Sequence, residues 1–128
     1  MIFRALALAL PVLTLASGVA LAQAAGDAEA GEKVFNQCKA CHTIEEGKNR
    51  VGPSLFGVIG RKSGSVAGFN YSDAMKKADI TWTPENLDKY LTDPKAFVPG
   101  NKMAFAGLKS PQDRQNVIAY LEHKGKKD

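Results

Sequence analysis

The sequence has few of the side chains from which most protein metal sites are built. Its 128 residues include only two cysteines and two histidines. A tetrahedral zinc site needs four ligands, and His123 lies near the far end of the chain from Cys38, Cys41 and His42. That spacing matches no known zinc module, so zinc binding is not the expected chemistry.

The sequence also lacks a continuous apolar run of the ~20 residues that a membrane-spanning helix needs. Its most apolar stretch is interrupted by Pro11 and Thr14 and is followed by Ser17 and Gly18. A transmembrane anchor is therefore the weaker interpretation of this N-terminal segment.

Residues 1–22 have instead the pattern of a secretory signal peptide. Arg4 precedes the apolar run, and small residues stand at Ala20 and Ala22. This order is typical of a cleaved export signal, and we expect cleavage near Ala22. The remaining residues, 23–128, are short enough that one domain is expected.

Charge is not concentrated on one part of the chain. Lysine and arginine number 17 against 13 aspartates and glutamates, and removal of the signal takes away Arg4 alone. The mature chain is mildly basic and has no concentrated basic stripe, so we expect no nucleic-acid partner. The lysines from Lys124 to Lys127 are interpreted as a frayed tail.

No segment alternates apolar and polar residues for long enough to indicate a sheet, and the predicted class is all-α with large loops. Capping residues and apolar spacing predict four helices, over residues 27–40, 72–78, 83–93 and 110–124. Residues 43–70, rich in glycine, and 93–109 are predicted to be irregular. Loops this long need an explanation, and a large cofactor that they wrap would provide the missing packing surface.

Residues 38–42 read Cys-Lys-Ala-Cys-His. Two cysteines at this spacing, followed at once by histidine, are the attachment pattern of c-type haem. The thiols of Cys38 and Cys41 reach two vinyl groups of one porphyrin, and the imidazole of His42 binds the iron. A thioredoxin-type redox pair would need a βαβ context that is missing, whereas a plain structural disulfide stays open in an oxidising compartment.

The sixth iron position has four candidate states: Met103, Met75, His123 or no protein ligand. His123 falls in the last turn of a predicted helix, where a solvated side chain is the simpler interpretation. Met75 lies on a short helix, where methionine commonly fills core space. Met103 follows Pro99 and Gly100 in an irregular segment, whose backbone is free to direct the sulfur at a metal. An open position would instead permit gas binding or peroxide chemistry.

Beyond the haem motif, matching stretches are distributed over the whole mature chain. They are Gly52-Pro53-Ser54-Leu55 with Gly57, Gly60-Arg61-Lys62, Gly68-Phe69-Asn70-Tyr71, Ile80-Thr81-Trp82, Pro94-Lys95, Pro99-Gly100-Asn101-Lys102-Met103, Phe105-Ala106-Gly107 and Ile118-Ala119-Tyr120-Leu121. With these stretches the chain resembles the class I cytochromes c, in particular the cytochrome c2 and mitochondrial-type branch. The resemblance implies few helices with long loops around one covalently bound haem c.

The resemblance also implies roles for particular residues. Met103 would be the second axial ligand beside His42, and the Pro53 carbonyl would accept the other imidazole proton of His42, which orients the ring. Tyr90 would lie near the Met103 sulfur. The residues implied to hold a haem propionate are Arg61, Tyr71 and Trp82. Trp82 and Tyr90 could equally be simple core aromatics, while Gly31 and Phe35 would pack the first helix against Tyr120.

Two positions depart from the common pattern of the family. Met75 stands where relatives commonly have an asparagine bonded to an internal water, and Asn101 stands where they commonly have threonine. The first departure weakens any transfer of that water network to this chain, and it leaves the reduction potential open.

The expected function is that of a periplasmic carrier of single electrons, not an enzyme. The rivals are a small haem peroxidase and a haem-based ligand sensor, both of which need an open iron position. The cytochrome bc1 complex is the expected donor, and a terminal oxidase or photosynthetic reaction centre the expected acceptor. We expect a monomer.

Overall fold

The computed structural model describes residues 9–12 and 26–126. Apart from residues 9–12, the predicted signal peptide lies outside the described residues, as does the predicted cleavage near Ala22. The single domain of residues 23–128 is therefore seen from residue 26 onward.

Within residues 26–126 all regular structure is helical. The helices are α1 (Ala28–Phe35), α2 (Asp73–Lys77), α3 (Pro84–Thr92), α4 (Pro94–Phe97) and α5 (Pro111–Lys124). The nearest approach to a sheet in this part of the chain is one isolated bridge between Lys62 and Thr81. The predicted all-α class with large loops is confirmed, and no helix of the described part is both long and apolar enough to cross a membrane.

The helices begin where the sequence provides capping side chains. Asp27 accepts hydrogen bonds from the amides of Glu29 and Ala30 at the start of α1. The equivalent caps of α2, α3 and α5 are Ser72, Thr83 and Ser110. These side chains satisfy amides that have no partner inside the helix, which accounts for the correct prediction of the starts of these helices.

The first helix is shorter than predicted, since α1 ends at Phe35 and not at residue 40. After it the chain tightens: the amide of Gln37 donates to the Val34 carbonyl at 3.1 Å, and that of Cys38 to the Phe35 carbonyl at 2.8 Å. Apolar spacing alone does not distinguish these tight turns from a continuing helix. The turns carry the chain from α1 directly into His42.

The segment 93–109, predicted to be irregular throughout, contains the single helical turn α4. Asp93 caps it by accepting a hydrogen bond from the Ala96 amide at 3.3 Å, and Pro94 occupies the first helical position. Four residues are too few to produce a periodic pattern, although the Asp-Pro pair is itself a helix-start signal.

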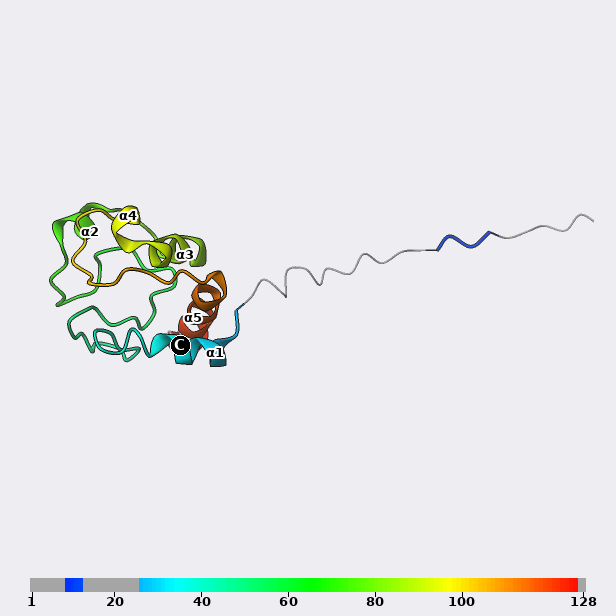
Figure 1. The fold of residues 1–128 in the computed structure, drawn as a ribbon, viewed down its shortest axis with the longest axis horizontal. Coiled ribbons are helices and arrows are strands. Elements are labelled where there is room, and N and C mark those ends of the chain that lie inside the picture. Colours follow the sequence, from blue (N-terminus) through cyan, green and yellow to red (C-terminus); the bar gives the residue numbers. More distant parts are fainter. Residues whose placement is uncertain (1–8, 13–25, 127–128) are drawn as a thin grey trace, which may run out of the picture.

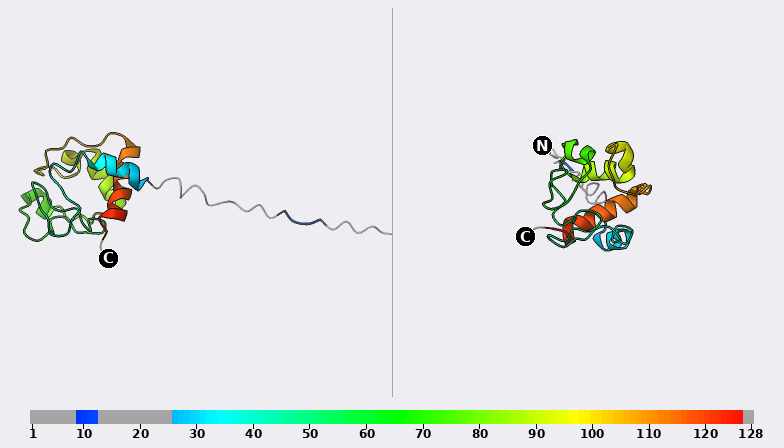
Figure 2. Two further views of the ribbon diagram at one scale, coloured as in Figure 1. Left: turned by 90° about the horizontal axis from the view of Figure 1, so that it is seen from below. Right: turned by 90° about the vertical axis from the view of Figure 1, so that its left-hand side faces the viewer.

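The first and last helices cross each other closely (Figures 1 and 2). A Cβ on Gly31 would overlap the backbone of Asn116, so only glycine permits this approach of α1 to α5. The rings of Phe35 and Tyr120 pack beside it, with centroids 5.3 Å apart. The contact inferred from the family resemblance is confirmed.

The remaining chain runs around the interior as loops. Residues 43–70 form one loop region, and the segment after α4 passes back toward the start of α5 (Figure 1). The buried core includes Val58 from the first loop region, Leu108 from the second and Val117 from α5. Helices and loops therefore enclose the interior together, and that interior contains the candidate site.

Candidate functional site

One cavity of about 320 Å³ lies between the loops and the inner faces of α1, α2, α3 and α5. Volumes of this order are usual for small-molecule and cofactor sites. All of the side chains predicted to contact the haem line it: Cys38, Cys41, His42, Pro53, Arg61, Tyr71, Trp82, Tyr90 and Met103. The structure thus brings together residues that are up to 65 positions apart in the sequence, from Cys38 to Met103.

The orientation of His42 is set by its neighbours. Its Nδ1 atom lies 2.7 Å from the carbonyl oxygen of Pro53. Because a carbonyl oxygen can only accept, Nδ1 carries the proton and the lone pair of the ring is on Nε2. Burial is the main cause that lowers the pKa of His42, opposed by the Pro53 hydrogen bond. A neutral imidazole with a free Nε2 is the form that binds metals.

Gly52 makes the close approach to His42 feasible. A Cβ at this position would lie 2.7 Å from Nδ1 and 2.9 Å from Nε2 of the imidazole, whereas ordinary contacts begin at 3.4 Å. The Gly52 amide also donates to the Cys41 carbonyl at 2.9 Å, which ties the loop to the cysteine motif. Backbone and ring are therefore in direct contact on this side of the cavity.

The two cysteines are not joined by a disulfide, and both are partly buried. Burial, with a smaller contribution from Cys41, raises the pKa of the Cys38 thiol to about 11. Redox-active thiols of Cys-x-x-Cys enzymes have lowered pKa values, so Cys38 does not have the electrostatics of a thiol oxidoreductase nucleophile. Among the described residues, no three His, Cys, Asp or Glu side chains gather in a group that could hold a metal ion.

Met103 faces the cavity with a polar neighbour. The Tyr90 hydroxyl donates to its sulfur over 3.8 Å. Burial raises the pKa of Tyr90 to about 12, so the phenol keeps the proton that it donates. The Tyr90 ring packs against Trp82 with centroids 4.9 Å apart. Both aromatic side chains are buried, so they are core residues as well as lining residues.

The other candidates for the sixth iron position differ in their places. Met75 is buried in α2 and also lines the cavity, so both methionines of residues 26–126 reach it. His123 is exposed in the last turn of α5 and lies outside the cavity lining. The hydrogen bond from Tyr90 distinguishes Met103 from Met75.

One part of the cavity wall is polar. Arg61 is half-buried, and its guanidinium donates to the Phe56 carbonyl. The Tyr71 hydroxyl accepts a hydrogen bond from the Val66 amide at 3.1 Å. A guanidinium and a phenol on one wall can bind a carboxylate, since charge-assisted hydrogen bonds to such groups are strong. Thiols, a neutral imidazole, a thioether and this polar wall around an apolar cavity form a donor set that fits haem.

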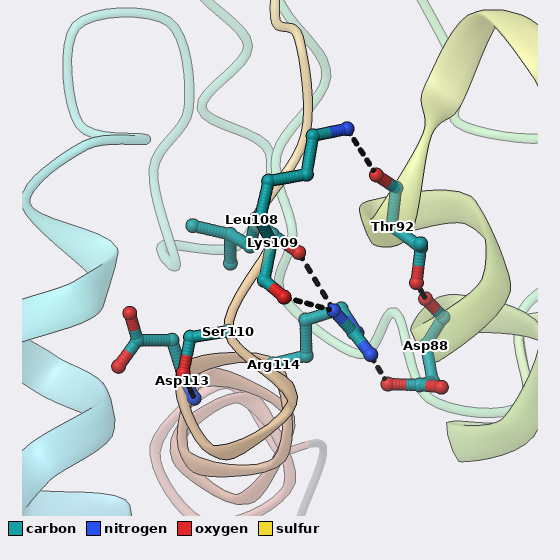
Figure 3. Close-up of polar contacts among 7 residues, drawn as sticks. All are labelled: Asp88, Thr92, Leu108, Lys109, Ser110, Asp113 and Arg114. Carbon is teal, nitrogen blue, oxygen red and sulfur yellow. Dashed lines mark hydrogen bonds and ion pairs between the residues drawn. The ribbon is translucent and has the colours of Figure 1, made fainter.

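Sequence reasoning missed Arg114, which holds together the surroundings of the cavity (Figure 3). Its Nε donates to Asp88 Oδ1 of α3 at 2.8 Å, and its terminal nitrogen to the Leu108 carbonyl at 2.8 Å. Arg114 is only 9% exposed. The available signal was its spacing from the buried Val117 and Leu121, which places it on the apolar face of α5.

Comparison with known proteins gives a consistent result. Residues 28–124 match the Cytochrome c family profile. The chain is 60% identical over 88 residues to cytochrome c2 iso-2 of Magnetospirillum fulvum, covering 69% of this chain and 92% of that protein. It is 58% identical over 103 residues to cytochrome c2 of Rhodomicrobium vannielii, covering 80% and 82%. The solved structure of cytochrome cH from Methylobacterium extorquens matches with a TM-score of 0.74 at 51% identity, over 77% of this chain and all of that one.

Proposed function

The chain belongs to the cytochrome c family, in its class I c2 branch, and we propose that it shuttles single electrons between membrane redox complexes in the bacterial periplasm. Members of this branch are electron carriers with one covalently bound haem c, not enzymes. The observation that supports the proposal best is the convergence of Cys38, Cys41, His42 and Met103 on one cavity.

The proposed roles of the site residues follow from their chemistry. Cys38 and Cys41 would form the two thioethers, and His42 Nε2 and Met103 Sδ would be the protein ligands of the iron. Arg61, Tyr71 and Trp82 would hold a propionate. Bound haem c supplies an iron that takes up and releases one electron at a time.

The remaining residues of the site hold and tune these ligands. The Pro53 carbonyl, 2.7 Å from His42 Nδ1, fixes the ring and increases the basicity of the ligating nitrogen. The hydrogen bond from Tyr90 to the Met103 sulfur reduces the electron density that the thioether can donate. With both His42 and Met103 on the iron, no position would be open to a substrate, as a carrier requires and a peroxidase or ligand sensor does not.

The location and partners belong to the same proposal. Residues 1–22 have the pattern of an export signal, which supports a periplasmic location. We propose the cytochrome bc1 complex as donor and a terminal oxidase or photosynthetic reaction centre as acceptor. The exposed lysines Lys39, Lys95 and Lys102 lie in or beside segments that line the cavity and would steer acidic partner surfaces toward it.

Intact mass and an optical spectrum of the protein purified from the periplasm test the proposal. We expect the mass of one haem added to a chain that begins near Gln23, haem that survives denaturing electrophoresis, and an iron–sulfur charge-transfer band in the oxidised protein. A haem-free chain with a disulfide between Cys38 and Cys41 would refute it. The Met75→Ala variant should keep the band and Met103→Ala should lose it, which tests the ligand choice.

A further inference from the structure

Asn101 uses both protons and the oxygen of its side-chain amide in hydrogen bonds. Its Nδ2 donates to the carbonyls of Pro94 at 2.9 Å and Val98 at 2.8 Å, and its Oδ1 accepts from the Met103 amide at 2.9 Å. The residue is 7% exposed and lines the same cavity as Met103. One buried amide therefore connects α4 to the backbone of the predicted ligand.

These bonds restrain the start of the segment that carries Met103. The Pro94 carbonyl of α4 also accepts from the Val98 amide at 3.0 Å, and the Val98 carbonyl from the Asn101 amide at 3.2 Å, so the Asn101 side chain adds a second hydrogen bond to each. Because the Met103 amide is held by the same side chain, Met103 cannot withdraw from the cavity as a residue without breaking that hydrogen bond. The sulfur is thereby positioned through its own main chain.

The end of the same segment is held independently. The Leu108 amide donates to the Leu91 carbonyl at 2.7 Å, and Arg114 donates to the Leu108 carbonyl (Figure 3). Lys109 Nζ adds a bond to the Thr92 carbonyl at 3.0 Å. Residues 101–109, which we call the Met103 segment, are thus attached at both ends, and Asn101 is the attachment nearest the sulfur.

We propose that Asn101 is a positioning residue that keeps Met103 on the iron against competing ligands. The inference rests on the proposed function, in which Met103 is the second axial ligand. A threonine hydroxyl has a single proton to donate, so it cannot bond both the Pro94 and Val98 carbonyls while accepting from the Met103 amide. Asparagine at this position makes displacement of Met103 costlier than threonine would.

Imidazole titration of the oxidised holoprotein tests the inference. Imidazole must displace Met103, so its apparent affinity depends on the population in which the segment has opened. The lost hydrogen bonds together contribute at least the net free energy of about one buried hydrogen bond. A loss of this size should increase the open population by roughly tenfold. We therefore expect Asn101→Ala to bind imidazole about tenfold more tightly than wild type, with Asn101→Thr in between.

The matched control is Asn116→Ala, because Asn116 is similarly buried, at 8% exposed, but its side-chain hydrogen bonds go to residues outside the Met103 segment. Its Oδ1 accepts from the Asp27 amide and from Gln112, both at 2.9 Å. This variant should lower the unfolding midpoint in guanidinium chloride as Asn101→Ala does, yet leave the imidazole affinity within about twofold of wild type, since no bond of the Met103 segment is removed.

The outcomes distinguish a failure of the positioning role of Asn101 from a failure of Met103 ligation. Wild-type imidazole affinity in both Asn101→Ala and Asn101→Thr, with the iron–sulfur band present, would overturn the positioning role and leave Met103 ligation intact. An equal gain of affinity in Asn116→Ala would overturn it too, because the effect would then be general destabilisation. Absence of the band from the wild-type protein would refute Met103 ligation itself, and the inference with it. Should Asn101→Ala fail to fold, Asn101→Thr alone decides the question.

Discussion

Replacing Gly52 by alanine should disturb the contact between the backbone and the imidazole of His42. The new Cβ would overlap Cε1 of the imidazole and lie 2.7 Å from Nδ1, so ring or backbone must move by much more than a small adjustment before an ordinary contact of 3.4 Å is reached. If the ring moves, its 2.7 Å bond to the Pro53 carbonyl is strained, and if the backbone moves, the bond from Gly52 to Cys41 is lost. Either change affects the histidine that we propose as an iron ligand.

The magnitude follows from two costs. Overpacking a close-packed site costs about 1–3 kcal/mol. A weakened hydrogen bond adds about 1 kcal/mol. We expect Gly52→Ala to reduce the free energy of unfolding by about 2–4 kcal/mol. The backbone of Gly52 does not lie in the left-handed region, so the loss would be steric and not conformational.

The assay is guanidinium chloride unfolding of the holoprotein, followed by the fluorescence of Trp82, the only tryptophan. Gly60→Ala is the matched control: Gly60 has a φ of +84° with open space around its Cβ, so alanine there should cost about 1–2 kcal/mol without touching His42. The reduction potential should shift in Gly52→Ala alone. The reasoning is refuted if Gly52→Ala is no less stable than Gly60→Ala and keeps the wild-type potential.

Three further predictions concern the ligand, the polar network and docking. Met103→His should lower the reduction potential in voltammetry, because a nitrogen ligand favours ferric iron more than a thioether does; an unchanged potential would mean that Met103 is not the ligand. Arg114→Met should lower the free energy of unfolding, measured in denaturant, by about 2–3 kcal/mol, since it leaves the buried Leu108 carbonyl and Asp88 without their partner. A change below about 0.5 kcal/mol would contradict this. Charge reversal in Lys102→Glu should slow electron transfer to an acidic partner at low salt, as measured by stopped flow. The difference in rate from wild type should shrink as the screening length falls to about 10 Å at 0.1 M, and a rate that does not depend on salt would exclude steering.

The parts of the fold that could be predicted are those encoded by neighbouring residues. Thr83 with Pro84, and Ser110 with Pro111, specify helix starts by local hydrogen bonding and a fixed φ, and α3 and α5 begin there. The attachment motif is likewise local, since the five residues 38–42 contain it entirely. Its assignment needed no knowledge of the rest of the chain.

The extent of α1 and the existence of α4 could not be derived from the same patterns. Val34, Phe35 and Cys38 keep helical spacing past the end of α1, because the tight turns that follow preserve a similar period. The single turn α4 is too short to have a period at all. Both errors concern residues where a few hydrogen bonds, not hydrophobic patterning, decide the backbone.

The site shows the same division between local and distant information. The roles expected for Pro53 and Tyr90 came from the family resemblance, and the structure gives each a matching contact with His42 or Met103. Arg114 bonds to Asp88, which is 26 positions away in the sequence, and nothing in the sequence around either residue indicates this pairing. For Asn101 the sequence revealed only that the residue was unusual, since its partners are main-chain atoms that every residue has.

The same main-chain bonds divide the Met103 segment into a held part and a free part. Asn101 bonds to the Met103 amide and Arg114 to the Leu108 carbonyl, so these hydrogen bonds do not depend on which side chains those backbone positions carry. The side chains of Lys102, Ala104 and Ala106 are exposed. Substitution can therefore alter the outer surface of the segment while the Met103 sulfur, which we propose as an iron ligand, stays in place. If the proposed roles hold, recognition and iron ligation share nine residues of chain, yet selection can act on each separately.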